Sequence, residues 1–313
     1  MAFVNIHVHT EFSALDGMIR VDKLAERCKE LGQDTMCITD HGTCGGFVKA
    51  QRAAAKHGVR FLPGIEAYQV DERTRDAGKK QKSFHQVLYA RNEEGYRNLL
   101  RLHFASFNKN PRFIFDRLIG QIDWELLEQY GKGLVGTSSC FIGAVPSYLR
   151  GGLQSEALKQ AKRYQKTLDM FVLEVQAHDM DGQKELNDQI FEIGLELDLP
   201  IVATTDAHYL DAEDAEVHDV LLAVQAKEGV HDPNRKFYFG SDQFYIKNEK
   251  EMASYFGEDV INNTQKVADF CDDATYVSSD ETKIPNFSID TAEDYPDFLK
   301  WLAKKYEKTG IIK

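Results

Sequence analysis

Two histidines stand one residue apart in NIHVHTEFSALDG, residues 5–17, at the end of a short apolar run. Side chains at positions i and i+2 of a β-strand point to the same face, so His7 and His9 would present two imidazoles side by side. Asp16 follows seven positions after His9. Imidazole nitrogens and a carboxylate grouped in this way suit a divalent metal ion.

Residues of metal-ligand type also stand at the ends of three later apolar runs. TMCIT leads into Asp40 and His41, RFLPGIEA contains Glu66, and PIVATT leads into Asp206 and His208. In a parallel β/α barrel the C-terminal ends of the strands share one mouth, so side chains from distant runs converge there. That mouth is where enzymes with this architecture carry out their chemistry.

Apart from Asp40, nine residues are candidate ligands when His85 and Cys140 are added: His7, His9, Asp16, His41, Glu66, His85, Cys140, Asp206 and His208. One zinc ion takes about four ligands, so this number fits two or three metals that share bridging oxygens. For any single histidine the alternative is a hydrogen-bonded core residue. His178 remains open between these two roles, and His218 is expected to cap a helix or orient a ligand.

The composition of the 313 residues, with 42% hydrophobic and 28% charged side chains, is that of a soluble globular protein. No long apolar run and no signal-like N-terminus is present, so we expect a cytoplasmic protein without a membrane partner. The five cysteines are scattered without CxxC spacing, which argues against a disulfide framework and predicts buried thiols. A net charge of -12 disfavours a large DNA-binding face, so any phosphate chemistry must be local.

Seven short apolar runs are predicted to be strands, at residues 3–8, 35–39, 60–67, 85–90, 133–137, 171–175 and 200–205. Amphipathic segments predict helices at residues 21–32, 95–107, 155–168 and 183–198. Strands that alternate with helices favour a parallel sheet, open or closed, and we expect an α/β fold closed into a barrel. Residues 69–83 are predicted to form an exposed loop, and residues 272–313 a tail with one short helix near YPDFLKWLAKKYEK.

Several motifs together resemble the N-terminal PHP (polymerase and histidinol phosphatase) domain of the bacterial replicative DNA polymerase III alpha subunit. They include HVHTEFSALDG, ITDHGTCGG, LPGIEAY, TSSCFIGAVP, FVLEVQAHD, VATTDAHYLDAEDAEVHDVLLAVQ and DPNRKFYFGSDQFYIKNEKEM. The resemblance runs from residue 1 to about residue 270, which gives a domain at 1–271 and a connector at 272–313. It implies a distorted seven-stranded β/α barrel with a metal centre at one mouth.

The resemblance implies that all nine candidate residues are ligands, with Glu66 as the bridging carboxylate. Some members of the polymerase family have lost several ligands and their activity, whereas this sequence fills every position. His85 opens its run instead of closing it, so in a parallel barrel it would lie toward the opposite mouth. It is retained as a ligand on the resemblance alone.

The Pro-Asp-x-Asp arrangement of the family's polymerase palm is absent, because YPDF at 295–298 lacks the last acid. We therefore expect that this chain does not polymerise DNA. It would be an excised piece of a longer polymerase, a split subunit or a free-standing descendant, and the connector-like tail favours the first two. The polymerase palm and fingers, on the same or a partner chain, and a separate proofreading subunit are the expected protein partners.

Two or three dications in such a centre would support phosphoester hydrolysis. The resemblance implies a 3′-5′ exonuclease acting on DNA 3′ ends, and the alternatives are a metal-stabilised scaffold or a phosphatase of the histidinol phosphate type. No nucleophile elbow, Walker motif or GxGxxG is present, so acyl transfer, NTP hydrolysis and dinucleotide binding are disfavoured. One thiolate among imidazoles and carboxylates leans toward zinc, with manganese or iron as alternatives. Arg20, Lys49 and Arg91 are the basic candidates for phosphate contacts, or ordinary solvated charges.

Overall fold

A curled, mixed sheet forms the centre of the compact unit Met1–Val277. The computed structural model describes residues 3–73, 81–108, 111–114 and 117–273. The strand order is β1-β2-β3-β7-β8-β9, and β6 pairs with β2. Their bounds are β1 Thr35–Ile38, β2 Arg60–Val70, β3 Ser83–Ala90, β6 Gln121–Ile122, β7 Leu134–Thr137, β8 Met170–Gln176 and β9 Ile201–Thr204.

The N-terminal segment joins the two edges of this sheet, but it is not the regular strand that the sequence predicted for residues 3–8. The Thr39 amide, just after β1, donates to the Val8 carbonyl, and the Ala207 amide, just after β9, donates to the His7 carbonyl. Nearer the N-terminus, a hydrogen bond to a side chain stands in place of backbone pairing with a strand, since the Val4 amide donates to Thr264 Oγ1. The distorted α/β barrel is therefore confirmed, with an irregular segment in one strand position.

One strand runs against the parallel direction that the sequence predicted for the whole sheet. β3 is antiparallel to both of its neighbours, β2 and β7, whereas β1–β2, β7–β8 and β8–β9 are parallel. The physical reason is the length of the connection, because the twelve residues 71–82 between β2 and β3 are at the lower limit of what the crossover of a parallel pair needs. The N-terminal end of β3 consequently lies beside the C-terminal ends of its neighbours. The predicted loop at 69–83 is shorter at both ends, and its residues 74–80 lie outside the described residues.

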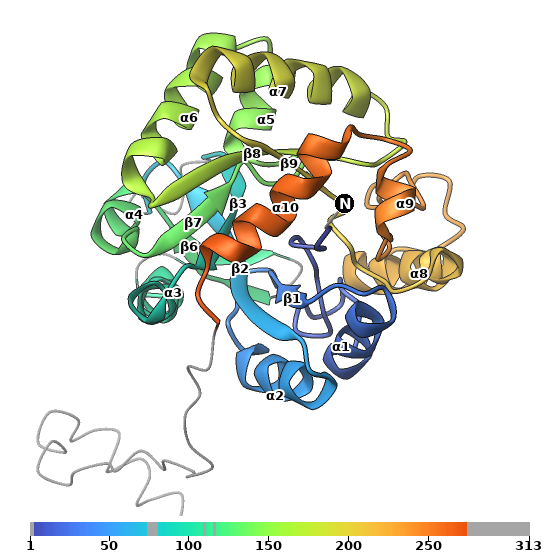
Figure 1. Cartoon of the computed structure of the whole chain (residues 1–313). Coiled ribbons are helices and arrows are strands. Elements are labelled where there is room, and N and C mark those ends of the chain that lie inside the picture. Colours follow the sequence, from blue (N-terminus) through green and yellow to red (C-terminus); the bar gives the residue numbers. More distant parts are fainter. Residues whose placement is uncertain (1–2, 74–80, 109–110, 115–116, 274–313) are drawn as a thin grey trace, which may run out of the picture. The chain divides into compact units, whose positions relative to one another are not determined.

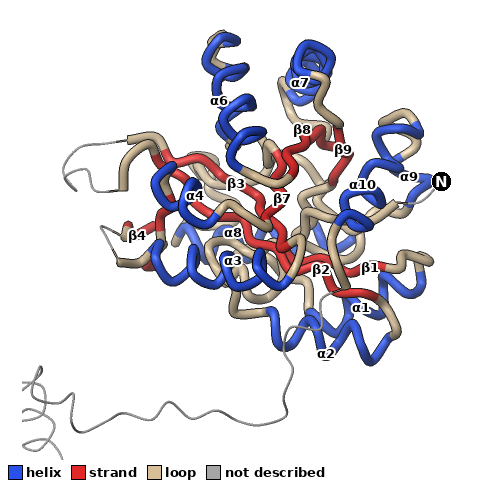
Figure 2. Tube along the Cα trace, turned by 60° about the vertical axis from the view of Figure 1, so that its left-hand side comes forward, coloured by secondary structure: helices blue, strands red, loops and turns tan. Residues whose placement is uncertain are grey.

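Helices cover the outside of the sheet (Figures 1 and 2). The four predicted helices are confirmed within a few residues: α1 Val21–Glu30, α3 Glu93–Ser106, α6 Gln154–Thr167 and α7 Gln183–Leu197. Elements whose bounds were not predicted are α2 Phe47–His57, α4 Trp124–Tyr130, α5 Ala144–Arg150, α8 Ala215–Ala226, α9 Glu249–Met252, α10 Glu258–Phe270, and the hairpin β4 Arg112–Ile114 with β5 Arg117–Ile119. The tail helix predicted near 295–308 lies outside the described residues.

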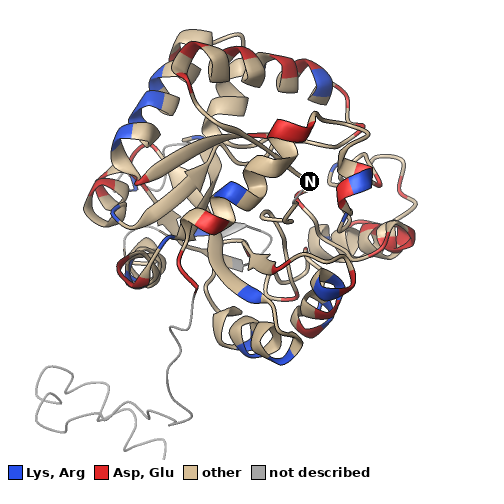
Figure 3. Ribbon diagram, in the orientation of Figure 1, with Lys and Arg blue, Asp and Glu red and all other residues tan. Residues whose placement is uncertain are grey.

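Acidic and basic side chains are interspersed over these outer helices (Figure 3). Within the described ranges, no helix combines the length and apolar character that crossing a bilayer requires. All five cysteines are buried and free, as the scattered spacing predicted.

Two apolar clusters build the core, one between the sheet and the helices and one inside the curled sheet. The inner cluster is completed by α10, which packs against β9 (Figure 1). Its buried members are Val4, Ile6, Cys37, Leu62, Val87, Tyr89, Val135, Val172, Val202, Val267, Ala268 and Cys271. The interior is thus filled with apolar side chains at the α10 end, and polar side chains take over toward the other end.

Candidate metal centre

Alternate side chains of a strand face the barrel interior, so the same strand contributes first to the inner apolar core and then to the polar cluster at the mouth. On β2, Leu62 and Glu66 point to the same face because they are an even number of residues apart, and on β8 Val172 and Glu174 do so. The apolar member of each pair belongs to the inner core, and the acid lies one or two steps further toward the mouth. The two-residue alternation that directs apolar side chains into the barrel therefore also directs Glu66 and Glu174 into it.

Glu66 lies at the centre of the candidate site and is almost fully buried. Its Oε1 lies 3.3 Å from His7 Nε2 and 3.2 Å from His85 Nδ1. Its Oε2 lies 3.3 Å from His9 Nε2 and 3.0 Å from His41 Nδ1. Each oxygen of one carboxylate thus faces two imidazoles, which is the arrangement that a carboxylate bridging two metal ions needs.

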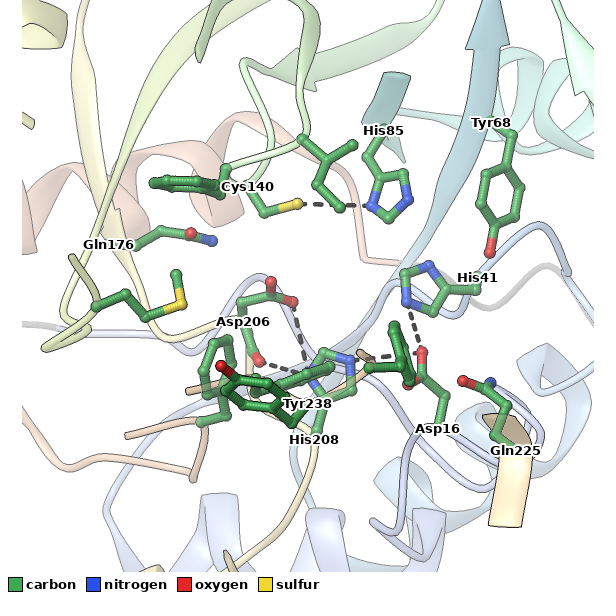
Figure 4. A pocket seen from close by; sticks show the side chains of 16 residues that line it. Asp16, His41, Tyr68, His85, Cys140, Gln176, Asp206, His208, Gln225 and Tyr238 are labelled. Atoms are coloured by element: carbon green, nitrogen blue, oxygen red, sulfur yellow. Dashed lines mark hydrogen bonds and ion pairs between the residues drawn. The ribbon is translucent and has the colours of Figure 1, made fainter. Parts of the chain in front are cut away.

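His85 reaches this cluster because β3 is antiparallel. Its position near the start of the strand puts it opposite Tyr68, near the C-terminal end of β2. Cys140 Sγ lies 3.5 Å from His85 Nδ1 and brings the thiol of the loop after β7 into the same group (Figure 4). The geometric objection to His85 in an all-parallel barrel is therefore removed.

Asp206 and Asp16 approach the imidazoles from two other loops. Asp206 Oδ1 lies 3.2 Å from His7 Nε2 and 3.1 Å from His9 Nε2. Asp16 Oδ2 lies 2.8 Å from His41 Nε2, and also 3.8 Å from His208 Nε2. Asp206 has a φ of 47°, a left-handed conformation that is uncommon for a residue other than glycine and occurs preferentially at functional sites.

The structure brings all nine candidate ligands into one contiguous cluster. Seven of them form three overlapping groups whose ligand atoms lie within 4.8 Å of one another: His7, His9, Glu66 and Asp206; His41, Glu66 and His85; and His9, His41 and His208. Asp16 and Cys140 are outside these groups but contact their members, as described above. Because a single imidazole nitrogen binds one ion, His9 serves only one of its two groups, and the set suits two or three ions.

The fit of metals to this site rests on buried polar atoms that lack hydrogen-bond partners. Among the described residues these include one ligand atom each from His7, His9, Asp16, His41, Glu66, Asp206 and His208. Buried polar atoms are rarely left unpaired, because the desolvation cost is not recovered. These seven atoms belong to the clustered side chains and have the donor chemistry, imidazole and carboxylate, that divalent transition metals take.

The histidines and carboxylates of the cluster shift each other's pKa values. Burial alone would lower the pKa of His7, but the carboxylates of Asp206 and Glu174 outweigh it and raise that pKa well above its usual value. Burial would raise the pKa of Glu66, yet His85 and His7 hold it well below the usual range. The Glu66 carboxylate therefore stays ionised in the interior, where positive charge beside it, from a protonated imidazole or a metal ion, stabilises it.

A second layer of side chains orients the ligands, and sequence reasoning missed most of it. The buried Glu174 accepts a hydrogen bond at 2.6 Å from His7 Nδ1 and another at 2.6 Å from Thr204 Oγ1. Partners of this kind fix the tautomer and ring orientation of a metal-binding histidine. An acid in the middle of the apolar run FVLEV was the signal that could have identified Glu174.

Asp40 has a similar supporting role and is not one of the clustered ligands. Its Oδ1 accepts from the Thr10 amide at 2.6 Å and from Ser13 Oγ at 2.9 Å. Ser13 Oγ in turn lies 3.0 Å from His9 Nδ1. His218, predicted as a cap or an orienting residue, contacts the Asp16 carbonyl through Nε2 at 2.9 Å. It therefore supports the loop that carries Asp16.

His178 lies outside the ligand cluster and behaves as a buried core residue. Its Nε2 lies 2.7 Å from the Thr205 carbonyl, and its ring packs on Phe244 with the centroids 3.8 Å apart. Burial lowers its pKa to about 4, which keeps the ring neutral. The core alternative therefore fits His178.

A cavity of about 330 Å³ opens over the cluster (Figure 4). Its lining includes the candidate ligands Asp16, His41, His85, Cys140, Asp206 and His208. The rest is largely apolar and aromatic: Tyr68, Phe141, Ile142, Met180, Phe237, Tyr238, Phe239 and Phe244, with Gln176 and Gln225 as uncharged polar members. A small organic group can therefore approach the cluster from this side.

Comparison with known proteins agrees with this geometry. The model of the PHP domain matches residues 5–178. The chain belongs to the PHP domain family. This match spans more than half of the chain and contains seven of the nine candidate ligands, all except Asp206 and His208.

The curated relatives of this PHP domain include bacterial DNA polymerase III alpha subunits. That of Treponema pallidum is 33% identical over 278 residues, which are 87% of this chain and 23% of that protein. That of Thermus aquaticus is 32% identical over 322 residues, 96% of this chain and 25% of that protein. That of Deinococcus radiodurans is 34% identical over 285 residues, 86% of this chain and 21% of that protein. The chain thus spans about a quarter of the length of these relatives.

Proposed function

We propose that this PHP domain is a metal-dependent phosphoesterase with 3′-5′ exonuclease activity on DNA. The observation that carries the proposal is the position of Glu66, whose two oxygens each face two imidazoles in a buried cluster. A purely structural site closes with about four protein ligands. Nine clustered ligand-type residues beside an open cavity exceed what structural stabilisation requires.

The ligands divide naturally among ion positions in this proposal. His7, His9 and Asp206 would hold one ion with Glu66, and His85 and Cys140 a second that shares Glu66. His41, Asp16 and His208 would complete the set, with His41 joining either neighbour through one of its two nitrogens. When bound, such ions activate water and neutralise the phosphoryl and leaving oxygens of a phosphoester. Zinc is the proposed metal because Cys140 is a soft ligand, with manganese or iron as alternatives.

The chain's own residues contribute positioning to this chemistry. Glu174 holds the His7 ring through Nδ1, so that Nε2 faces the cluster. Ser13 and Asp40 hold His9 in the same way. The aromatic walls of the cavity restrict water around the reacting group.

DNA as the substrate is supported by the relatives, which are named DNA polymerase III subunit alpha. The polymerase palm and fingers, on the same or another chain, and a separate proofreading subunit would then be partners in the cytoplasm. Residues 1–271 would be the PHP domain and residues 272–313 the connector. The domain's own grip on DNA should be weak. Lys49 pairs with Glu11, Arg91 with Asp169 at 2.8 Å, and Arg20 with Asp22 at 3.6 Å, so these cations are already engaged.

Two other functions have specific support. A scaffold whose metals only stabilise the barrel is consistent with how deeply Glu66 and His7 are buried. A phosphatase for small monoesters is consistent with the size of the cavity. Neither alternative accounts both for the similarity to polymerase subunits and for the open cavity lined by candidate ligands.

The test is hydrolysis by the purified chain after removal of metals and reloading with zinc or manganese. Substrates are a primed duplex with a 3′ mismatch, single-stranded DNA and p-nitrophenyl phosphate. Release of mononucleotides that depends on the reloaded metal supports the exonuclease. Hydrolysis of p-nitrophenyl phosphate alone would favour the phosphatase, and no hydrolysis of any substrate at full metal occupancy would favour the scaffold.

A further inference from the structure

Gln225, on α8, presents an unused carboxamide to the cavity above the metal-ligand cluster. The side chain is 3% exposed, and neither its Oε1 nor its Nε2 has a hydrogen-bond partner among the described residues. It lines the same cavity as Asp16 and His208 (Figure 4). A buried primary amide with both ends unpaired is costly, because burial strips its hydration without replacing the lost bonds.

A second carboxamide lines the cavity across from Gln225 in Figure 4. Gln176, at the end of β8, is 2% exposed and donates through Nε2 to Glu174 at 3.2 Å. Its Oε1 has no partner within the described part of the chain. The cavity therefore offers uncharged donors and acceptors in addition to the charged ligand cluster.

Aromatic side chains line the same cavity as these two carboxamides. Phe239 packs edge-on against the His208 ring with centroids 4.8 Å apart, and against Phe244 at 4.5 Å. Next to it Tyr238 lines the cavity while 60% exposed. An exposed aromatic side chain in the lining of a cavity offers a flat face for a planar ligand.

We propose that Gln225 and Tyr238 form a nucleobase subsite for the terminal nucleotide, an inference that rests on the proposed phosphoesterase function. The base would stack on Tyr238, its hydrogen-bonding edge would meet the Gln225 amide, and its phosphate would face the ligand cluster. Carboxamides bind the N6 and N7 edge of adenine through two bonds, and base stacking on aromatic rings tolerates every base. Gln225 therefore confers preference among bases, and Tyr238 gives affinity for all of them.

The test measures binding of product-like ligands to the zinc-loaded chain by isothermal titration calorimetry, and it needs no turnover. The ligands are the four deoxynucleoside 5′-monophosphates, deoxyribose 5-phosphate and inorganic phosphate. For the wild-type chain we expect nucleotides to bind more tightly than the two ligands without a base. Gln225→Leu should lower affinity for the preferred nucleotide about tenfold and leave affinity for inorganic phosphate unchanged.

Tyr238→Ala should weaken all four nucleotides by about tenfold without changing their order of preference. Gln225→Met is a second variant of similar size, in case leucine perturbs α8, and melting temperature confirms folding of each. The matched control is Gln265→Leu on α10, whose side chain is half-buried and does not line this cavity. Equal binding of nucleotides and deoxyribose 5-phosphate, or an unchanged preference in both Gln225 variants, would overturn the subsite. Failure of the proposed function would look different, because inorganic phosphate would then not bind in a zinc-dependent way.

Discussion

Replacing Glu174 with glutamine tests whether the supporting layer, and not only the ligands, sets metal affinity. Glu174→Gln keeps the size of a side chain that is 1% exposed. An amide oxygen can still accept from His7 Nδ1 and Thr204 Oγ1, both at 2.6 Å in the native protein. What disappears is the negative charge behind the His7 ring.

The expected magnitude follows from that single change. A carboxylate that accepts from the distal nitrogen of a ligating histidine makes the other nitrogen a stronger donor to the metal, and losing such partners costs about 10–100-fold in metal affinity or activity. This corresponds to roughly 1.4 to 2.7 kcal/mol of binding free energy. Folding should suffer less, because the amide retains hydrogen bonds and burying it costs less than burying a charge.

The measurement is a competition titration of zinc between the apo chain and a chromophoric chelator, followed by hydrolysis assays at saturating zinc. The matched control is Thr204→Val, which removes one hydrogen bond from the same carboxylate but leaves its charge and its bond to His7. We expect the control to bind zinc within a few-fold of wild type. Wild-type zinc affinity in Glu174→Gln, with an unchanged melting temperature, would refute the role assigned to Glu174.

Three further predictions concern the whole centre. Elemental analysis of chain never exposed to chelators should find two or three transition-metal ions per molecule, and one ion or fewer would contradict the shared-ligand arrangement. His9→Ala and Asp206→Ala should each lower the rate of hydrolysis by several orders of magnitude and leave the fold largely intact, whereas His57→Ala at the end of α2 should not; a mutant as active as wild type at equal metal occupancy would point to another site. DNA affinity measured with a non-catalytic divalent ion should fall with salt at a log–log slope of about -1 to -3, and sub-micromolar binding with a steep slope would show that the domain holds DNA unaided.

The sequence was sufficient to predict residues whose chemistry is visible at the ends of apolar runs. His41, Glu66 and Asp206 each follow or close such a run, and the structure places them in one cluster. His85 was different, because its contribution depends on a strand direction that periodicity does not encode. A run such as HQVLYA looks the same whether it lies parallel or antiparallel to its neighbours.

Residues whose role depends on partners far along the chain were beyond sequence reasoning. Glu174 supports His7, 167 residues away, and Asp40 acts on Thr10 and Ser13 instead of joining the ligands. Gln225 has no distinguishing local motif, since a glutamine in a helix is ordinary. Its unpaired amide becomes visible only when burial and the cavity lining are known. The local pattern identified side chains of metal-ligand type, but three-dimensional contacts were needed to separate the candidate ligands from the residues that support them.

The candidate metal centre and the inner core depend on the same strand registers. On β9, Val202 packs in the inner core and Thr204 bonds Glu174, and Asp206 follows two residues after the strand ends. A slip of one residue would turn Val202 and Thr204 to the opposite face and displace the loop that carries Asp206. Such a slip would bury polar groups among the outer apolar residues and remove a ligand at once, so the apolar core excludes it. The precision of the candidate site is therefore a consequence of core packing below it, and substitutions in the inner layer at Val202 or Val172 should disturb metal binding without contacting a ligand.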